Sequence, residues 1–204
     1  MIRCDVDGDV WRITIDRPDK AGALSREMLV ELAEISERAT TAKAVIYGGT
    51  GSVFSAGADF EQARAGLATD PVWERLSGAI AALPGFTIAA LNGTVAGGAF
   101  GMVLACDIRV AVAKAKFFYP VMKLGFLPQP SDPARLASLI GPARAKMILM
   151  AGQKIDAAEA LNWGLIDRIV PDDALSDHVE QLSGDAVNAD HTHIHGIKQL
   201  IPDG

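Results

Sequence analysis

The 204-residue chain is 50% hydrophobic, and its 19 Lys and Arg against 25 Asp and Glu give a formal net charge of −6 at pH 7. This composition suits one domain with a large buried core, and the modest negative charge without a basic run argues against nucleic acid or an anionic membrane as a partner. Cys4 and Cys106 have no metal-type spacing, and no apolar run approaches the ~18 residues of a membrane helix. The first residues also lack the pattern of a signal peptide. We therefore expect a cytoplasmic protein with a buried Cys106 thiol.

In chain order, alternating apolar and polar residues first predict a β-hairpin over residues 2–7 and 10–16, with its turn at Gly8-Asp9. Ser25 is a candidate N-cap for an amphipathic helix over residues 26–39. A short buried strand over residues 44–47 leads through glycines to a short helix after Asp59. A helix over residues 71–83 and a strand over residues 87–91 follow.

The strand over residues 87–91 ends at Asn92-Gly93, and we expect a tight turn that leads directly to a helix beginning at Gly97-Gly98. The first N–H groups of a helix have no partner inside it, and the helix dipole is positive there. This combination suits an anion, or a carbonyl that becomes one during a reaction. The alternative is that the glycine pair only permits close packing between helix and strand.

The second half of the chain continues to alternate strands and helices. A strand over residues 107–112, an extended segment over 116–120 and a proline-rich loop over 128–133 come first. Ser131 or Asp132 is expected to cap a helix with Pro133 in its first position. Further helices are predicted over residues 142–150, 157–163, 174–182 and 190–201, with a strand over 165–170. The alternation indicates an α/β fold with parallel strands joined by right-handed crossovers.

Two strand-to-loop junctions resemble each other. If the strands over residues 44–47 and 87–91 are neighbours, both following loops emerge at the same carboxyl edge, where open α/β sheets bind ligands. The backbone N–H groups of Ala58 and Gly98 then converge on one oxygen. Such a pair stabilises an enolate or a tetrahedral oxyanion, and one donor contributes roughly 2.7–4 kcal/mol in the transition state.

Several further motifs occur in a recognisable order. They are Ile15-Asp16-Arg17-Pro18, Phe54-Ser55-Ala56-Gly57-Ala58-Asp59, Asn92-Gly93, Gly97-Gly98, Ala105-Cys106-Asp107-Ile108-Arg109, Lys123-Leu124-Gly125 and Ala157-Ala158-Glu159-Ala160 with Gly164-Leu165. Over residues 10–171 the chain resembles the enoyl-CoA hydratase/isomerase (crotonase) superfamily. The resemblance implies a crotonase-like α/β spiral of ββα units, with an acyl-CoA-binding core over residues 1–171 and a shortened helical segment over 172–204. It also implies a homotrimer or hexamer, a role in fatty acid metabolism, and no cofactor beyond the coenzyme A of the substrate.

The resemblance further implies where an acyl-CoA thioester binds. The thioester carbonyl is expected between the N–H groups of Ala58 and Gly98, the two halves of the oxyanion hole. Side-chain charge at Arg17, Lys20 and Arg26 is expected to help hold the CoA, unless these side chains form only a solvated surface. The residues expected along the substrate and its CoA are Lys20, Ala21, Ala23, Leu24, Ala56, Ala58, Asp59, Phe60, Glu61, Gly97 and Gly98.

The carboxylates that the family's hydratases use are absent from their expected positions. The positions that match their two glutamates hold Gly101 and Val121, and the aspartate of other branches falls at Pro128 or Gln129. None of these side chains moves a proton, which general acid–base catalysis requires. The chain is therefore either an enoyl-CoA hydratase or isomerase with an unusual acid or base, or a catalytically inactive acyl-CoA-binding protein.

Four other side chains are candidates for moving the proton. Asp132, three residues after Gln129, is the nearest carboxylate in sequence and our candidate acid or base, although it also fits the N-cap of the following helix. Glu74 lies on the helix over the predicted pocket, where an ion pair or solvent exposure is the alternative. Tyr119 is more typical of a core and Lys123 of a surface. A histidine cluster near the end of the chain is interpreted as a solvated helix end, so no metal is expected: His191, His193 and His195.

Overall fold

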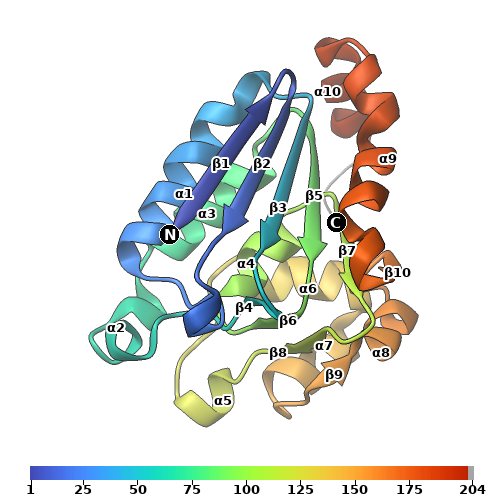
Figure 1. Ribbon diagram of the computed structural model, residues 1–204. Coiled ribbons are helices and arrows are strands. Elements are labelled where there is room, and N and C mark those ends of the chain that lie inside the picture. The colour runs from blue at the N-terminus through green and yellow to red at the C-terminus, as the bar shows by residue number, and fades with distance from the viewer. Residues whose placement is uncertain (202–204) are drawn as a thin grey trace.

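The computed structural model describes residues 1–201, which form two sheets. The larger sheet runs in the order β1-β2-β3-β5-β7-β10, with β1 antiparallel to β2 and every other pair parallel (Figure 1). Its strands are β1 Ile2–Asp7, β2 Val10–Ile15, β3 Ala44–Gly49, β5 Phe86–Leu91, β7 Ile108–Val112 and β10 Arg168–Val170. The predicted hairpin and the predicted neighbourhood of the strands over residues 44–47 and 87–91 are both confirmed.

A smaller sheet lies below the large one and runs in the order β4-β6-β8-β9 (Figure 1). Its strands have only two or three residues each: β4 Val53–Ser55, β6 Thr94–Ala96, β8 Lys116–Phe118 and β9 Ile155–Asp156. The expected direct passage from the Asn92-Gly93 turn to a helix is therefore wrong, because β6 intervenes. A three-residue strand is too short to produce a recognisable alternation of apolar and polar residues.

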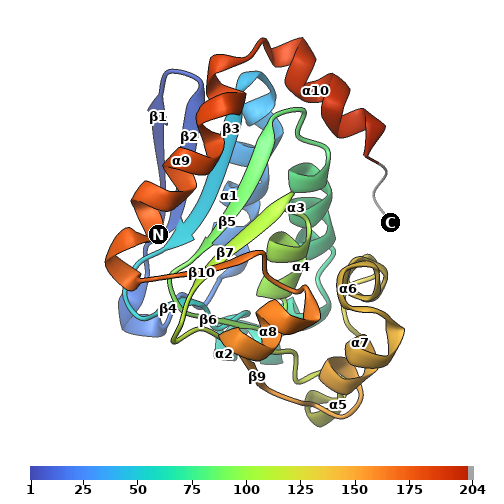
Figure 2. The ribbon, with the colours of Figure 1, turned by 90° about the vertical axis from the view of Figure 1, so that its right-hand side faces the viewer.

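Helices cover both faces of the large sheet, with α1 and α3 packed together on one face and α9 across the other (Figure 2). The helices are α1 Arg26–Arg38, α2 Phe60–Arg64, α3 Val72–Ala81, α4 Ala99–Leu104, α5 Val121–Leu124, α6 Asp132–Ile140, α7 Pro142–Leu149, α8 Ala157–Trp163, α9 Leu175–Asn188 and α10 His191–Leu200. Short 3-10 turns are η1 Pro18–Lys20, η2 Ala39–Thr41, η3 Leu67–Thr69 and η4 Asp172–Ala174. Of the predicted C-terminal segment 172–204, the last three residues lie outside the described part.

Helix α1 illustrates how the sequence forms these elements. Its buried residues recur at helical spacing, and the Ser25 side chain accepts a hydrogen bond from the Met28 N–H, as an N-cap does. One polar group on the buried face, Ser36, is satisfied because its hydroxyl donates to the Leu32 carbonyl and bonds the Tyr47 hydroxyl at 2.8 Å. Cys106 is also buried, as predicted.

Gly93 allows the loops before the two short strands β4 and β6 to approach each other. A Cβ atom at this position would lie 2.0 Å from the Ser52 carbonyl oxygen, whereas a Cβ on Gly78, inside α3, would meet nothing within 4 Å. We expect Gly93→Ala to lower the free energy of unfolding by about 3 kcal/mol, because backbone must move. Gly78→Ala is the control and should raise it by about 0.5–1 kcal/mol. Urea unfolding curves measure both, and equal effects would contradict this reading.

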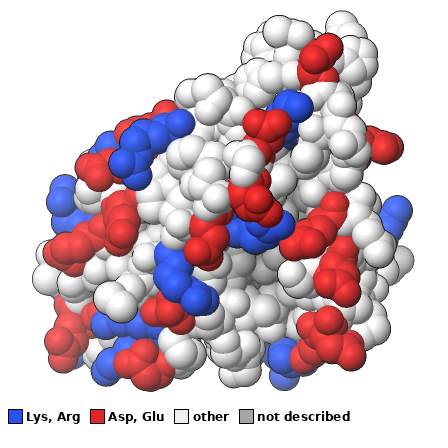
Figure 3. Space-filling view, turned by 45° about the horizontal axis from the view of Figure 1, so that its top comes forward, with Lys and Arg blue, Asp and Glu red and all other residues white. Residues whose placement is uncertain are grey.

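Charged side chains of both signs are interspersed on the face that Figure 3 shows, without a broad basic field. Within residues 1–201, no helix is long and apolar enough to cross a membrane.

Candidate active site

The two loops that carry Ala58 and Gly98 meet where β4 and β6 end. Gly57 has a φ of +87°, and a Cβ atom there would lie 2.7 Å from the Ala96 carbonyl oxygen and 3.4 Å from the Gly98 nitrogen. The lack of a side chain at Gly57 therefore lets the two backbones touch. The parallel pairing of β4 with β6 holds both loops at the same edge. The structure thus brings together the two residues that the sequence analysis paired.

The N–H groups of Ala58 and Gly98 donate no hydrogen bond among residues 1–201. Both residues are partly exposed, so a ligand oxygen can reach them. The Trp73 ring lies directly against Gly98: a Cβ atom there would be 3.0 Å from its Cδ2 atom. The indole N–H of Trp73 donates to the Leu67 carbonyl at 2.8 Å, which fixes the ring in this position. The arrangement offers two free donors beside an apolar wall, which suits a carbonyl oxygen.

The two segments predicted along the CoA are bonded to each other. Leu24 donates its N–H to the Gly57 carbonyl at 2.8 Å and accepts from the Asp59 N–H at 2.8 Å. Ala56 donates to the Ala21 carbonyl at 3.0 Å, and the Ser55 hydroxyl donates to the Gly22 carbonyl at 2.8 Å. Residues 20–24 and 56–61 are therefore held side by side next to Ala58, although Leu24, which was predicted to lie along the CoA, is fully buried.

The three cations predicted near this surface are in different situations. Arg17 is paired with Asp59 at 3.0 Å, and Arg26 is paired with Asp70 at 2.9 Å. Lys20 is exposed and forms no ion pair among the described residues. Phe60 is also exposed and carries the Arg64 guanidinium 5.2 Å from its ring centre. Lys20 is therefore the cation most available to a phosphate.

Asp132 is buried, with 1% of its surface exposed, and it does not cap α6. Ser131 is the N-cap residue, Asp132 is the first residue of the helix, and the expected capping hydrogen bond is absent. The Asp132 Oδ2 atom instead accepts the Tyr119 hydroxyl at 2.9 Å, while Oδ1 has no partner among residues 1–201. The N-cap alternative for Asp132 is therefore wrong, because tertiary contacts turn the Asp132 side chain inward. Pro133 in the first helical position is also wrong, because the helix begins one residue earlier.

The Oδ1 atom of Asp132 lies against Gly101. A Cβ atom on Gly101 would be 2.9 Å from Oδ1, so the carboxylate occupies the space next to the missing side chain. Gly101 lies one turn of α4 after Gly98, and its N–H donates to the Gly98 carbonyl at 3.1 Å. One helical turn spans about 5.4 Å along the axis. A buried carboxylate therefore stands beside α4, about one helical turn after the Gly98 donor.

Burial raises the pKa of Asp132 to about 7, because desolvation disfavours the charged form. The Tyr119 hydroxyl opposes this by donating to the carboxylate, the negative charge of Glu74 raises the pKa further, and Arg135 lowers it. A carboxyl group that titrates near neutral pH exchanges protons readily, which suits a general acid or base.

Glu74 is partly buried and forms no ion pair among residues 1–201. Its carboxylate accepts the Ser131 N–H at 3.3 Å and contacts the Ser131 hydroxyl. The ion pair weighed for Glu74 is therefore not found among residues 1–201, and the carboxylate instead links α3 to the start of α6. Lys123 is exposed, as expected of a surface residue. Tyr119 is buried as expected, and its contact with Asp132 was not foreseen.

Two other positions at which the resemblance implies carboxylates make structural contacts. Val121 is buried and begins the short helix α5. Gln129 is buried, and its side chain donates to the Ala68 carbonyl at 3.1 Å. Of the residues that contact Gly98 and Gly101, the sequence analysis missed Trp73. Trp73 directly precedes Glu74, which the sequence analysis placed on a helix over the predicted pocket. This neighbourhood was the signal that could have identified Trp73 as a residue of the site.

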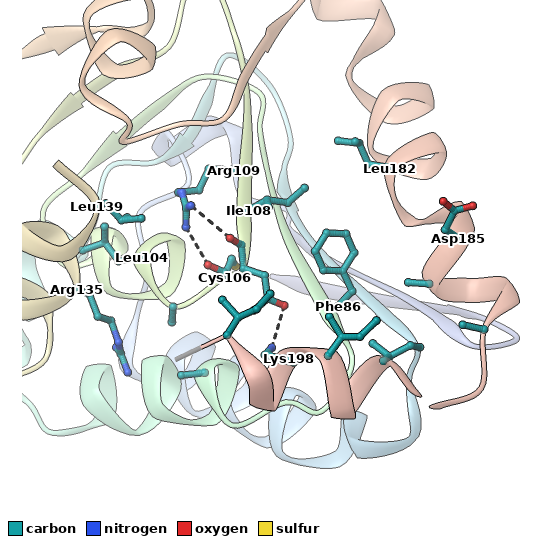
Figure 4. Close-up of a pocket in the computed structure, with 18 of the residues that line it drawn as sticks. Phe86, Leu104, Cys106, Ile108, Arg109, Arg135, Leu139, Leu182, Asp185 and Lys198 are labelled. Atoms are coloured by element: carbon teal, nitrogen blue, oxygen red, sulfur yellow. Dashed lines mark hydrogen bonds and ion pairs between the residues drawn. The ribbon is translucent and has the colours of Figure 1, made fainter. Parts of the chain in front are cut away.

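A separate cavity of about 1010 Å³ opens under α10 (Figure 4). It is lined by the C-terminal part of α4 and by α6, α9 and α10, and by none of Ala58, Gly98 and Asp132. Lys198 of α10 reaches across to Asp107 at 2.9 Å, and Arg109 donates to the Cys106 and Asp107 carbonyls (Figure 4). Helices α4 and α6 thus begin at the candidate site and end at this cavity. Among residues 1–201, no group of three or more metal-ligating side chains occurs.

Residues 5–202 match the family model for enoyl-CoA hydratase/isomerase. The chain belongs to this family. Carnitinyl-CoA dehydratase from Citrobacter koseri is 35% identical over 203 residues, which cover 95% of this chain and 77% of that protein. The corresponding dehydratase from Escherichia coli K12 is 32% identical over the same shares.

Solved structures of the family superpose closely on this chain. A Thermobifida fusca protein described as a putative enoyl-CoA hydratase in complex with CoA gives a TM-score of 0.89 at 29% identity, covering 98% of this chain and 83% of that one. Enoyl-CoA hydratase from Bacillus anthracis gives 0.89 at 29% identity, covering 97% and 81%. The crotonase-like fold inferred from the sequence motifs is thereby confirmed.

Proposed function

We propose that this chain binds an acyl-CoA thioester with its carbonyl oxygen between the N–H groups of Ala58 and Gly98, and that Asp132 moves the proton. The observation that carries the proposal is the buried Asp132 carboxylate, whose Oδ1 atom lies beside Gly101 and has no partner in the described part of the chain. The unpaired Ala58 and Gly98 donors support the first half of the proposal, because they match the needs of an enolate oxygen.

The reaction class that fits is hydration of a 2-enoyl thioester, or the reverse dehydration. Hydration adds a hydroxyl to the β carbon and a proton to the α carbon, and dehydration removes both as water. Each direction passes through negative charge on the thioester oxygen, which two donors stabilise. The relatives named carnitinyl-CoA dehydratase favour this class over isomerisation. The alternative is a protein that binds the thioester without turning it over. It is favoured by the residues at positions 101 and 121, because glycine and valine have no group that can donate or accept a proton.

In this proposal the reaction uses side chains and backbone groups of the protein, and no cofactor other than the coenzyme A that is part of the substrate. Lys20 and the surface over residues 20–24 and 56–61 would hold the CoA. Assembly as a homotrimer or hexamer and a role in fatty acid metabolism remain part of the proposal, and sedimentation of the purified chain tests the assembly.

The purified chain should be incubated with crotonyl-CoA and with carnitinyl-CoA, and the enoyl thioester followed by its absorbance. Calorimetry with the same thioesters measures binding independently. We expect turnover of at least one thioester, with the Asp132→Asn variant as the control that binds without turnover. Binding without turnover in the unmodified chain would establish the binding-only alternative, and the absence of binding would refute both.

A further inference from the structure

Tyr119 holds one of the two carboxylate oxygens of Asp132. Its hydroxyl donates to Oδ2 at 2.9 Å and accepts the Gln129 N–H at 3.4 Å, so the hydroxyl proton points at Asp132. Its ring packs on Phe100 with 5.4 Å between the ring centres, and Tyr119 as a whole is 5% exposed. Because Phe100 precedes Gly101 on α4, the tyrosine is fixed to the helix that begins at Gly98.

The other oxygen of Asp132 is left for the substrate. Oδ1 is buried without a partner among residues 1–201 and lies 2.9 Å from the place where a Gly101 side chain would begin. A buried carboxylate oxygen with no donor is costly unless a ligand or water meets it. We propose that Tyr119 is a positioning residue, which engages Oδ2 so that Oδ1 is the oxygen that exchanges protons with the substrate. This inference rests on the proposed function.

Three other features lie near the Asp132 carboxylate. Glu74 from α3 is anchored through Ser131, Arg135 lies one turn later on α6, and the uncharged Gly101 lies on α4. Tyr119 stabilises the ionised carboxylate through its hydrogen bond, and Glu74 destabilises it through like charge. Removing the tyrosine hydroxyl and removing the glutamate charge therefore act on Asp132 in opposite directions. If Tyr119 only filled space in the core, removing its hydroxyl would not shift the Asp132 pKa in the direction opposite to removing the Glu74 charge.

The test uses the full chain labelled with ¹³C at the aspartate carboxyl carbons, titrated by NMR, with Asp132→Asn identifying the Asp132 signal. In Tyr119→Phe the ring and its packing on Phe100 remain and the hydroxyl is lost, so the Asp132 pKa should rise by about one unit. In Glu74→Gln it should fall. Thermal melts check that both variants fold.

Turnover adds a second readout. Tyr119→Phe should lower kcat at least tenfold and change KM by less than a factor of two. The pKa seen in the pH dependence of kcat should shift in the same direction as the Asp132 pKa measured by NMR. An Asp132 titration unchanged by Tyr119→Phe overturns the inference, as does an unchanged kcat profile in an active protein. Opposite NMR shifts without turnover of any thioester would establish the Tyr119–Asp132 coupling and refute the proposed function instead, because NMR needs no substrate turnover.

Discussion

Asp132→Asn is expected to lower kcat by about 10²–10⁴-fold, the usual contribution of a positioned general acid or base. Asparagine keeps the shape of the side chain and can still accept the Tyr119 hydroxyl, so KM should stay nearly unchanged. Steady-state kinetics with the thioester that the wild-type chain turns over measures both quantities. Asp173, which is exposed and forms no ion pair among the described residues, provides the control Asp173→Asn, and activity should be retained there.

The same substitution is expected to stabilise the protein above neutral pH. The pKa of Asp132 in the folded state is raised from 3.8 to about 7, so between these values the folded chain holds a proton that the unfolded chain has lost. Stability therefore falls as pH rises through this window, by up to about 1.4 kcal/mol per pH unit. Asparagine does not ionise, so the variant avoids on the order of 4 kcal/mol of this loss at pH 8 and almost none at pH 4.

Unfolding in urea at pH 5 and pH 8 measures this difference. The advantage of Asp132→Asn over wild type should grow between the two pH values, whereas Asp173→Asn should follow wild type at both. A variant that is less stable than wild type at pH 8 would show that the buried carboxylate is not strained by its surroundings. A gain in stability together with a loss of activity is typical of a functional group whose burial is costly.

A carboxylate supplied from position 101 is expected to restore part of the activity that Asp132→Gly removes. The Asp132 carboxyl carbon lies 3.6 Å from the position of a Gly101 Cβ atom, and a glutamate reaches farther from Cβ than an aspartate does. Asp132→Gly alone should lose about 10³-fold in kcat. The double variant Gly101→Glu with Asp132→Gly should regain at least tenfold over that loss, because the carboxylate returns to the same space from α4.

Two controls separate charge from volume in this experiment. Gly101→Gln with Asp132→Gly fills the space without a carboxylate and should remain as inactive as Asp132→Gly. Gly101→Glu alone places two carboxylates in one space and should destabilise the chain by about 1–3 kcal/mol. Equal activity of the glutamate and glutamine double variants would contradict the view that the two positions are interchangeable sources of one carboxylate.

Much of this site could be predicted from the sequence because its backbone parts are local. Gly57 and the Gly97-Gly98 pair are motifs a few residues long, and each lies directly after a strand. The parallel pairing of β3 with β5 then brings the two loops to one edge. Ser25 capped its helix as predicted because the donor, Met28 N–H, lies only three residues away. In these cases the partners are near in sequence, or they are set by strand order.

The tertiary structure alone decided what Asp132 does. By itself the sequence made Asp132 a candidate for either a helix cap or an acid, since an aspartate before Pro133 fits both. The partners that turn it inward lie elsewhere in the chain: Tyr119 is 13 residues away, and Glu74 meets Ser131 across 57 residues. Local backbone geometry determines a cap, whereas the pKa of a carboxyl group depends on which distant elements bury it. The glycine loops could therefore be predicted from the sequence. The environment of Asp132, the group that we propose moves the proton, is set by tertiary packing and could not.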